Sequence, residues 1–166
     1  AAVSVSENGT AVTTIVATDA GAVLSYAITG GADAARFTIN ASTGVLTFVS
    51  APNFEAPTDV GGNNVYDVVV QVSDGTNTDT QAIAVTVTAV NDNSPAITSD
   101  GGGASASVNV AENSTAVTTV TATDADAGST LTYTISGGAD SAKFTIDSAT
   151  GVLTFVSAPD FESPTD

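Results

Sequence analysis

The chain contains no cysteine, methionine, tryptophan or histidine. Without cysteine and histidine it has no disulfides, no thiolate or imidazole metal ligands, and none of the nucleophiles and bases that these residues supply to catalysis. Lysine and arginine together occur twice, against eighteen acidic residues, so the net charge is −16 over 166 residues. Such a surface repels nucleic acids and anionic membranes. The ligand groups that remain are hard oxygen donors, which favour cations.

Long hydrophobic runs are also missing. No apolar stretch approaches the roughly 20 residues of a membrane-spanning helix, so we expect no direct membrane insertion. The first residues lack the basic start of a signal peptide, and any export signal or anchor is expected outside the sequence. No nucleophile, base and cofactor motif occur together, so we predict that the chain is not an enzyme.

The strongest positive feature is an internal repeat. Residues 4–20 return as residues 109–125, and residues 30–59 return as residues 137–166 with roughly three quarters of the positions identical. A period of about 105 to 107 residues is typical of a tandem array of domains and not of a short-repeat solenoid.

The repeat predicts two modules of unequal length. Residues 1–93 form a complete module, and residues 94–166 form a partial module that lacks the last strands, two by count. We expect the sequence to be an excerpt of a longer repetitive protein.

Apolar residues alternate with polar ones throughout the first module, which is typical of strands with one face in a core and one in water. Glycine, asparagine and aspartate clusters separate the alternating runs. About seven short strands in about 100 residues predict an all-β fold of tandem Greek-key β-sandwiches, with the aromatic rings in the core. The alternating sets are Leu24, Tyr26 and Ile28; Leu46 and Phe48; Tyr66, Val68, Val70 and Val72; and Ile83, Val85 and Val87.

Acidic and amide residues gather where one repeat gives way to the next. The strings Asn91-Asp92-Asn93-Ser94-Pro95, Glu112-Asn113 and Asp124-Ala125-Asp126 follow Glu7-Asn8 and Asn53-Phe54-Glu55 in the order of the cadherin repeat. In this combination the chain resembles the cadherin-like tandem repeats of large bacterial surface and secreted adhesin proteins. Each string alone is a weak signal.

The resemblance implies that Ca²⁺ binds at the junction between the modules. Ca²⁺ takes six to eight oxygen ligands and accepts carboxylates, amides and carbonyls together, as an Asn-Asp-Asn string supplies. Without an ion, crowded carboxylates repel one another, so we expect a mobile joint in the absence of calcium. Carried over from the family, the metal ligands are Glu7, Glu55, Asn91, Asp92, Asn93, Asp124 and Asp126.

Three departures from the family pattern predict fewer or weaker calcium sites. Ala89 stands where the family's linker usually opens with Asp, and Asn53 stands where an Asp is usual. The third departure is that the counterpart of Asp74 in the second module lies beyond Asp166. Separately, Asp19 lacks the second Asp of a DxD pair, so we expect no calcium site at Asp19 and Asp74.

Two other groups of acids have simpler interpretations. Asp33 and Asp140 precede Arg36 and Lys143 by three residues and are expected to form exposed ion pairs, worth roughly 0–1 kcal/mol each. Asp67 and Asp79 belong to no recurring arrangement and are expected on the surface.

The function that the resemblance implies is a calcium-stiffened structural repeat of an extracellular or cell-surface, bacterial adhesin or matrix or filament protein. The expected partners are neighbouring repeats or like chains, with polysaccharide or cell surfaces as further candidates. One alternative is a carbohydrate-binding module. Another is a filament subunit completed by strand exchange between chains, because a sandwich without its last strands exposes unpaired edges.

Overall fold

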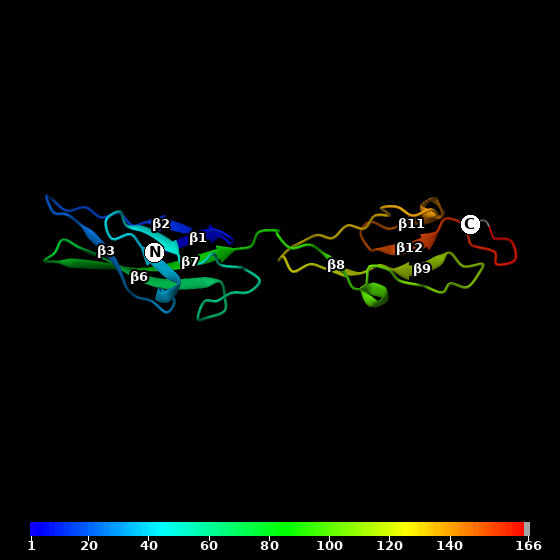
Figure 1. Ribbon diagram of the computed structural model, residues 1–166, viewed down its shortest axis with the longest axis horizontal. Coiled ribbons are helices and arrows are strands. Elements are labelled where there is room, and N and C mark those ends of the chain that lie inside the picture. Colours follow the sequence, from blue (N-terminus) through cyan, green and yellow to red (C-terminus); the bar gives the residue numbers. More distant parts are fainter. Residues whose placement is uncertain (165–166) are drawn as a thin grey trace. The chain divides into compact units, whose positions relative to one another are not determined.

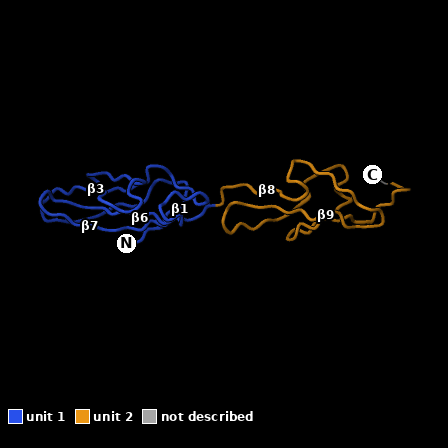
Figure 2. The backbone as a smooth tube through the Cα atoms, turned by 90° about the horizontal axis from the view of Figure 1, so that it is seen from below, with its two compact units in different colours: residues 1–90 blue, residues 91–166 orange. Residues whose placement is uncertain are grey.

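Alternating valine, isoleucine and tyrosine residues form the two longest strands of the chain, which pair as one antiparallel hairpin. These are β6 (Val65–Ser73) and β7 (Thr78–Thr88). The structure, a computed structural model, describes residues 1–164. It divides into two compact units, residues 1–90 and residues 91–166 (Figure 2).

Unit 1, residues 1–90, consists of two sheets. The first sheet has the strand order β1-β7-β6-β3 and the second has the order β2-β5-β4 (Figure 1). β3 pairs with β6 and not with β4 or β5, so the chain crosses to the other sheet and returns, as in a Greek key. The remaining elements are β1 (Ala2–Ser6), β2 (Ala11–Thr14), β3 (Ser25–Gly30), the 3₁₀ turn η1 (Ala34–Arg36), β4 (Phe37–Ile39) and β5 (Val45–Phe48).

The core of unit 1 lies between these two sheets. Phe37 and Phe48 stack at 4.7 Å between ring centroids, and Tyr66 meets Phe48 edge-on at 5.2 Å. Each fully buried side chain of this kind contributes about 1.5–3 kcal/mol to folding. The buried set is Phe37, Leu46, Phe48, Tyr66, Val68, Val70, Ile83, Val85 and Val87.

The structure confirms the all-β sandwich that the alternation predicted. The residues expected to face the core in β5, β6 and β7 are buried, apart from half-buried Val72 near the end of β6. Tyr26 and Ile28 in β3 are half-buried, and Phe54 packs against the core. Within residues 1–164 the helical elements are three 3₁₀ turns of three residues each.

Unit 2, from residue 91, repeats only part of this arrangement in its described residues. β9, β11 and β12 are the counterparts of β2, β4 and β5 and form the sheet β11-β12-β9, while β8 pairs with β10. The elements are β8 (Ala96–Ile97), η2 (Ser99–Gly101), β9 (Ala116–Thr119), β10 (Ala122–Thr123), η3 (Ser141–Lys143), β11 (Phe144–Ile146) and β12 (Val152–Phe155).

Asp33 corrects the expectation of an exposed ion pair. It is only 4% exposed, and its two carboxylate oxygens accept the backbone N–H groups of Val60 at 2.7 Å and Asp67 at 2.9 Å. Its own N–H donates to the carbonyl of Asp67 at 3.0 Å. Asp33 therefore fastens the turn after β3 to the start of β6.

Substituting Asp33 tests this role, and the repeat supplies a matched control. We expect Asp33→Ala to destabilise unit 1 by about 3 kcal/mol, because the backbone N–H groups of Val60 and Asp67 lose a buried, charged acceptor. The equivalent Asp140→Ala in unit 2 should change stability by less than about 0.5 kcal/mol, since Asp140 is exposed. Urea unfolding, monitored in each unit by amide hydrogen exchange, measures both changes in stability. Equal changes for Asp33→Ala and Asp140→Ala would contradict the role of Asp33.

Candidate metal centre

Glu7 is a buried carboxylate at the end of β1. It is 4% exposed, and its oxygens accept the N–H of Phe54 at 2.7 Å and the N–H of Val90 at 2.8 Å. The backbone holds it there, because the Glu7 N–H pairs with the Thr88 carbonyl and Asn8 adopts φ +65°. Glu7 thus joins the loop at Phe54 to the last residue of unit 1.

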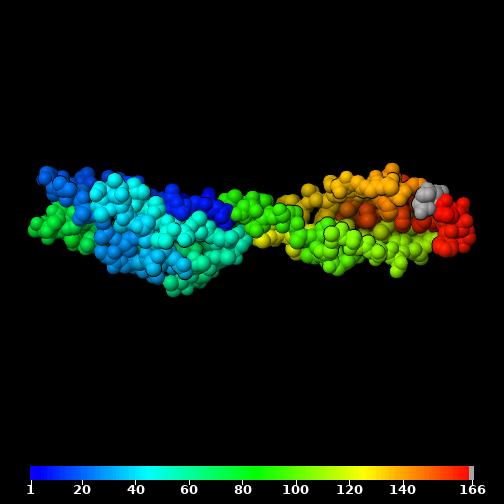
Figure 3. All heavy atoms as spheres, viewed as in Figure 1, coloured from blue at the N-terminus to red at the C-terminus, as the bar shows by residue number. Residues whose placement is uncertain are grey.

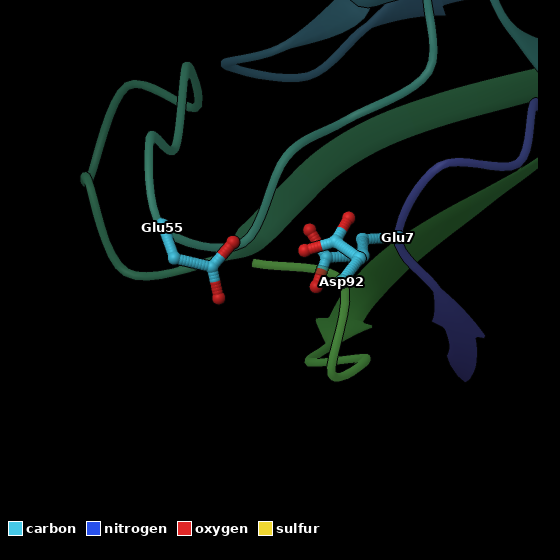
Figure 4. Close-up of side chains that lie close together, drawn as sticks. All are labelled: Glu7, Glu55 and Asp92. Carbon is cyan, nitrogen blue, oxygen red and sulfur yellow. The ribbon is translucent and has the colours of Figure 1, made fainter. Parts of the chain in front are cut away.

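Glu55 and Asp92 bring two more carboxylates to Glu7. Glu55 comes from the loop after β5, and both of its carboxylate oxygens are shielded from solvent. Asp92 lies two residues after Val90, the last residue of unit 1. Each of the three side chains offers an oxygen within 4.8 Å of the others (Figure 4). We call this group the Glu7–Glu55–Asp92 cluster.

The chemistry of this cluster fits a hard cation. Ligand oxygens on opposite sides of a Ca²⁺ ion lie about 4.6–5.2 Å apart, which is the spacing at which these carboxylates gather. Glu7 keeps lone pairs for a metal, because each of its carboxylate oxygens accepts one of these two backbone N–H groups and has two lone pairs. Three carboxylates this close repel one another unless a cation or protons offset their charge.

The predicted ligands of the second repeat form their own hydrogen-bonded group within unit 2. Asp126 is 5% exposed and accepts both the backbone N–H of Asn93 at 2.8 Å and its side-chain amide at 2.7 Å. The hydrogen bond from the side-chain amide of Asn93 lowers the pKa of Asp126, and this effect exceeds the opposite effect of burial. Asp124 accepts the N–H of Asp126 at 2.9 Å, and the Asn91 amide donates to Ser129.

A second cluster in unit 2 was missed by the sequence analysis. Glu112, Asp160 and Glu162 each offer an oxygen within 4.8 Å of the others, and all three are exposed. Glu112 accepts the N–H of Phe161 at 3.0 Å, as Glu7 accepts that of Phe54. The internal repeat could have predicted this second cluster, because Glu112, Asp160 and Glu162 are the counterparts of Glu7, Asn53 and Glu55.

Asp74 has a local structural role at the β6–β7 turn. It accepts the N–H groups of Asn77 and Thr76, both at 2.6 Å, and the side-chain amide of Asn77 at 3.1 Å. These hydrogen bonds, with that from the Asn77 backbone the strongest, lower the pKa of Asp74 to about 2. Its carboxylate therefore closes the hairpin turn.

Unit 1 is a two-sheet β-sandwich with a carboxylate cluster at the end of β1. The second repeat, residues 106–166, matches the family model of the Cadherin domain. No helix among residues 1–164 has the length and apolar character needed to cross a membrane.

Solved structures of cadherins share this fold. The crystal structure of human protocadherin-24 EC1-2 has a TM-score of 0.76 and 24% sequence identity, covering 99% of this chain and 77% of that one. The cis-dimer structure of protocadherin gammaB7 EC3-6 has a TM-score of 0.74 and 24% identity, covering 98% and 43% of the two chains. At these identities the likeness establishes the fold.

A curated relative shares a short stretch of sequence. Halomucin from Haloquadratum walsbyi is 55% identical over 38 residues, which are 23% of this chain. The same stretch rounds to 0% of the length of halomucin, so the chain corresponds to a very small part of that protein.

The difference between Glu7 and Glu112 gives a testable prediction for the apo protein. In a chelator, Glu7→Ala should destabilise unit 1 by about 2–4 kcal/mol, because two backbone N–H groups lose a buried charged acceptor. Glu112→Ala should lower the free energy of unfolding by about 1 kcal/mol or less, since Glu112 is exposed and accepts the N–H of Phe161. Urea unfolding of both variants decides the matter, and a Glu7→Ala protein as stable as the parent would refute the structural role.

The low pKa of Asp74 predicts a pH dependence. The pKa of Asp74 is about 2 in the folded chain and 3.8 ordinarily. Its ionised form therefore stabilises the hairpin above about pH 4. This contribution is lost as the pH falls towards 2. An NMR titration of the Thr76 and Asn77 amides should give a midpoint near 2, and Asp74→Asn should abolish that transition. A midpoint near 3.8 would show that the two backbone hydrogen bonds do not persist in solution.

Proposed function

We propose that the chain is a pair of calcium-stiffened modules from an extracellular adhesin or matrix or filament protein. The observation that carries the proposal is the Glu7–Glu55–Asp92 cluster. It gathers carboxylates from β1, from the loop after β5 and from the connecting segment, in a chain of net charge −16. Bound Ca²⁺ would relieve the repulsion of these carboxylates and fix the segment that leaves unit 1.

The ligands of the second repeat complete the proposal. Asp124 and Asp126 would supply carboxylate oxygens, and Asn91 and Asn93 would supply amide or backbone carbonyl oxygens, which are the ligand types that Ca²⁺ accepts. Support comes from the family order of these residues and from the match of the second repeat to the Cadherin domain. In this mechanism the ion sets the angle between successive modules and turns a flexible array into a stiffer one.

The Glu112–Asp160–Glu162 cluster supports a repeated use of the same device. It has an aspartate where unit 1 has Asn53, and therefore a third carboxylate that unit 1 obtains only from Asp92. We propose that it binds a cation in the same manner. A regular series of such sites along the chain is what a stiffened tandem array requires.

The comparison with cadherin structures also suggests the kind of partner. Cadherin-type neighbours include a cis-dimer of protocadherin gammaB7, and we propose neighbouring repeats or like chains as partners here. A carbohydrate-binding function finds less support. Among the aromatic side chains of residues 1–164, only that of Phe161 is highly exposed, at 83%. One ring does not make the stacking platform that a sugar requires.

The first test is thermal unfolding with excess Ca²⁺ and with a chelator, at fixed ionic strength. For a dissociation constant in the extracellular range of roughly 10⁻⁴–10⁻³ M, Ca²⁺ at 100 times that value should stabilise the folded chain by about 2.7 kcal/mol per site. Identical unfolding curves would refute calcium binding. Sodium or magnesium at the same ionic strength controls for charge screening.

Substitutions locate the ion. Asp92→Ala and Asp124→Ala should each lower calcium affinity by about tenfold or more, since each removes a charged ligand, and both proteins should stay folded. Asp79→Ala is the matched control, because Asp79 is an exposed acid of β7 that belongs to neither cluster. Calorimetric titration of the three variants measures the affinities. A titration unchanged by Asp92→Ala and Asp124→Ala would remove the junction assignment.

A further inference from the structure

The loop between β5 and β6 carries Glu55, and residues 49–64 contain neither a strand nor a helix. Figure 3 shows this loop on the surface of unit 1, in the cyan-to-green part of the colour bar. A side chain on a surface loop has no fixed direction unless other groups hold the backbone beside it. The place of Glu55 in the Glu7–Glu55–Asp92 cluster therefore depends on what holds the loop.

Two side chains hold the backbone of Phe54, the residue before Glu55. Glu7 accepts the N–H of Phe54 at 2.7 Å, and the side-chain amide of Asn64 donates to the carbonyl of Phe54 at 2.9 Å. This carbonyl and the nitrogen of Glu55 belong to one planar peptide group. The hydrogen bond from Asn64 thus fixes the orientation of the peptide from which Glu55 starts.

Asn64 is itself firmly held at the start of β6. It is 9% exposed, its N–H donates to Oδ1 of buried Asp59 at 3.1 Å, and its carbonyl accepts the N–H of Val87 at 2.8 Å. Its φ of +61° lies in the left-handed region, which asparagine adopts more readily than most residues. The side-chain amide therefore has a fixed position from which it can hold the loop.

The other side-chain atom of Asn64 shows that stability alone does not explain this residue. Its Oδ1 is buried, and no donor among residues 1–164 forms a hydrogen bond with it. Burying an unpaired acceptor opposes folding by about as much as one hydrogen bond favours it, or more. Glycine would adopt the same φ without this penalty. What asparagine adds here is the donor to Phe54.

We propose that Asn64 is a positioning residue of the Glu7–Glu55–Asp92 cluster. Its amide holds the carbonyl of Phe54 and thereby sets the direction of Glu55, while Asn64 itself is not a ligand. This inference rests on the proposed calcium-binding function, and it assigns to Asn64 a part of the affinity and of the selectivity of that site.

A fixed direction of Glu55 favours Ca²⁺ over Mg²⁺. Ligand oxygens on opposite sides of Mg²⁺ lie about 4.0–4.2 Å apart, which is closer than the about 4.6–5.2 Å across Ca²⁺. Figure 4 shows Glu55 coming from a different segment than Glu7 and Asp92. Glu7 is held by two backbone N–H groups, so a Glu55 that cannot move inward prevents the cluster from closing around the smaller ion.

Replacing Asn64 by glycine removes the amide and keeps a residue that adopts positive φ. Calorimetric titration with Ca²⁺ and with Mg²⁺ should show that Asn64→Gly lowers the calcium affinity by about tenfold and the magnesium affinity by less than about threefold. Asn63→Gly is the matched control, because Asn63 is exposed and its side-chain oxygen accepts the N–H of Val65 at 3.0 Å. This control should keep the ratio of the two affinities.

A double-mutant cycle shows whether Asn64 acts through Glu55. When Glu55→Gln has removed the charge of that ligand, Asn64→Gly should lower the calcium affinity by less than about twofold further. The same tenfold loss in both backgrounds would mean that Asn64 affects the site by another route, and would contradict the proposal.

Hydrogen exchange in a chelator tests the hold on the loop without calcium. In the parent chain the side-chain amide of Asn64 should exchange at least about tenfold more slowly than that of Asn63. In Asn64→Gly the N–H of Phe54 should exchange about tenfold faster, whereas the N–H of Val90, which Glu7 also accepts, should change by less than about twofold.

The outcomes separate this inference from the proposed function. Fast exchange of the Asn64 amide in the parent chain would overturn the inference even if Asn64→Gly does not fold. An unchanged ratio of calcium to magnesium affinity in Asn64→Gly would overturn it as well. A parent chain that binds no calcium would refute the proposed function, and the exchange rates in the chelator would then decide alone whether Asn64 holds the peptide before Glu55.

Discussion

The pairing of the β6–β7 hairpin with the rest of the sandwich is the interaction on which the structure depends. In unit 1 this hairpin covers Phe37, Leu46 and Phe48 and gives β1 and β3 their partner strands. It also supplies the Asp67 N–H that Asp33 accepts. In unit 2, with no such hairpin among its described residues, the equivalent aromatic side chains are partly exposed and two strands are absent. One packing contact thus determines the core, the sheet edges and the burial of a charge.

Carboxylates have several physical roles in this acidic chain. Asp33 and Glu7 are buried because backbone N–H groups compensate for the water that they lose. Asp74 closes a turn in the same way while it remains near the surface. The clusters at Glu7 and Glu112 differ from these, since several carboxylates converge there beyond what backbone donors explain. Convergence, and not acidity, separates a candidate cation site from a structural acid.

The repeat made much of the fold and part of the candidate site predictable. The period of two in β6 and β7 identified their buried residues. The acidic strings predicted seven ligands, and three of these, Glu7, Glu55 and Asp92, lie together in one cluster. The same repeat contained the Glu112–Asp160–Glu162 cluster, although the family pattern directed attention to the junction alone. Asp33 was wrongly assigned, because an acid three residues before Arg36 is locally indistinguishable from an exposed ion pair.

By itself the sequence determined the strands, the turns, the tandem repeat and the anionic character of the chain, because alternation, turn residues and charge are local properties. Only the tertiary structure decided which carboxylates are buried and what they bind. Asp33 and Asp140 have nearly the same neighbours in sequence, yet one is buried and the other exposed. The difference arises from β6, a strand more than 30 residues away in the chain, whose Asp67 N–H reaches Asp33. Such long-range contacts determine the environment of each acid.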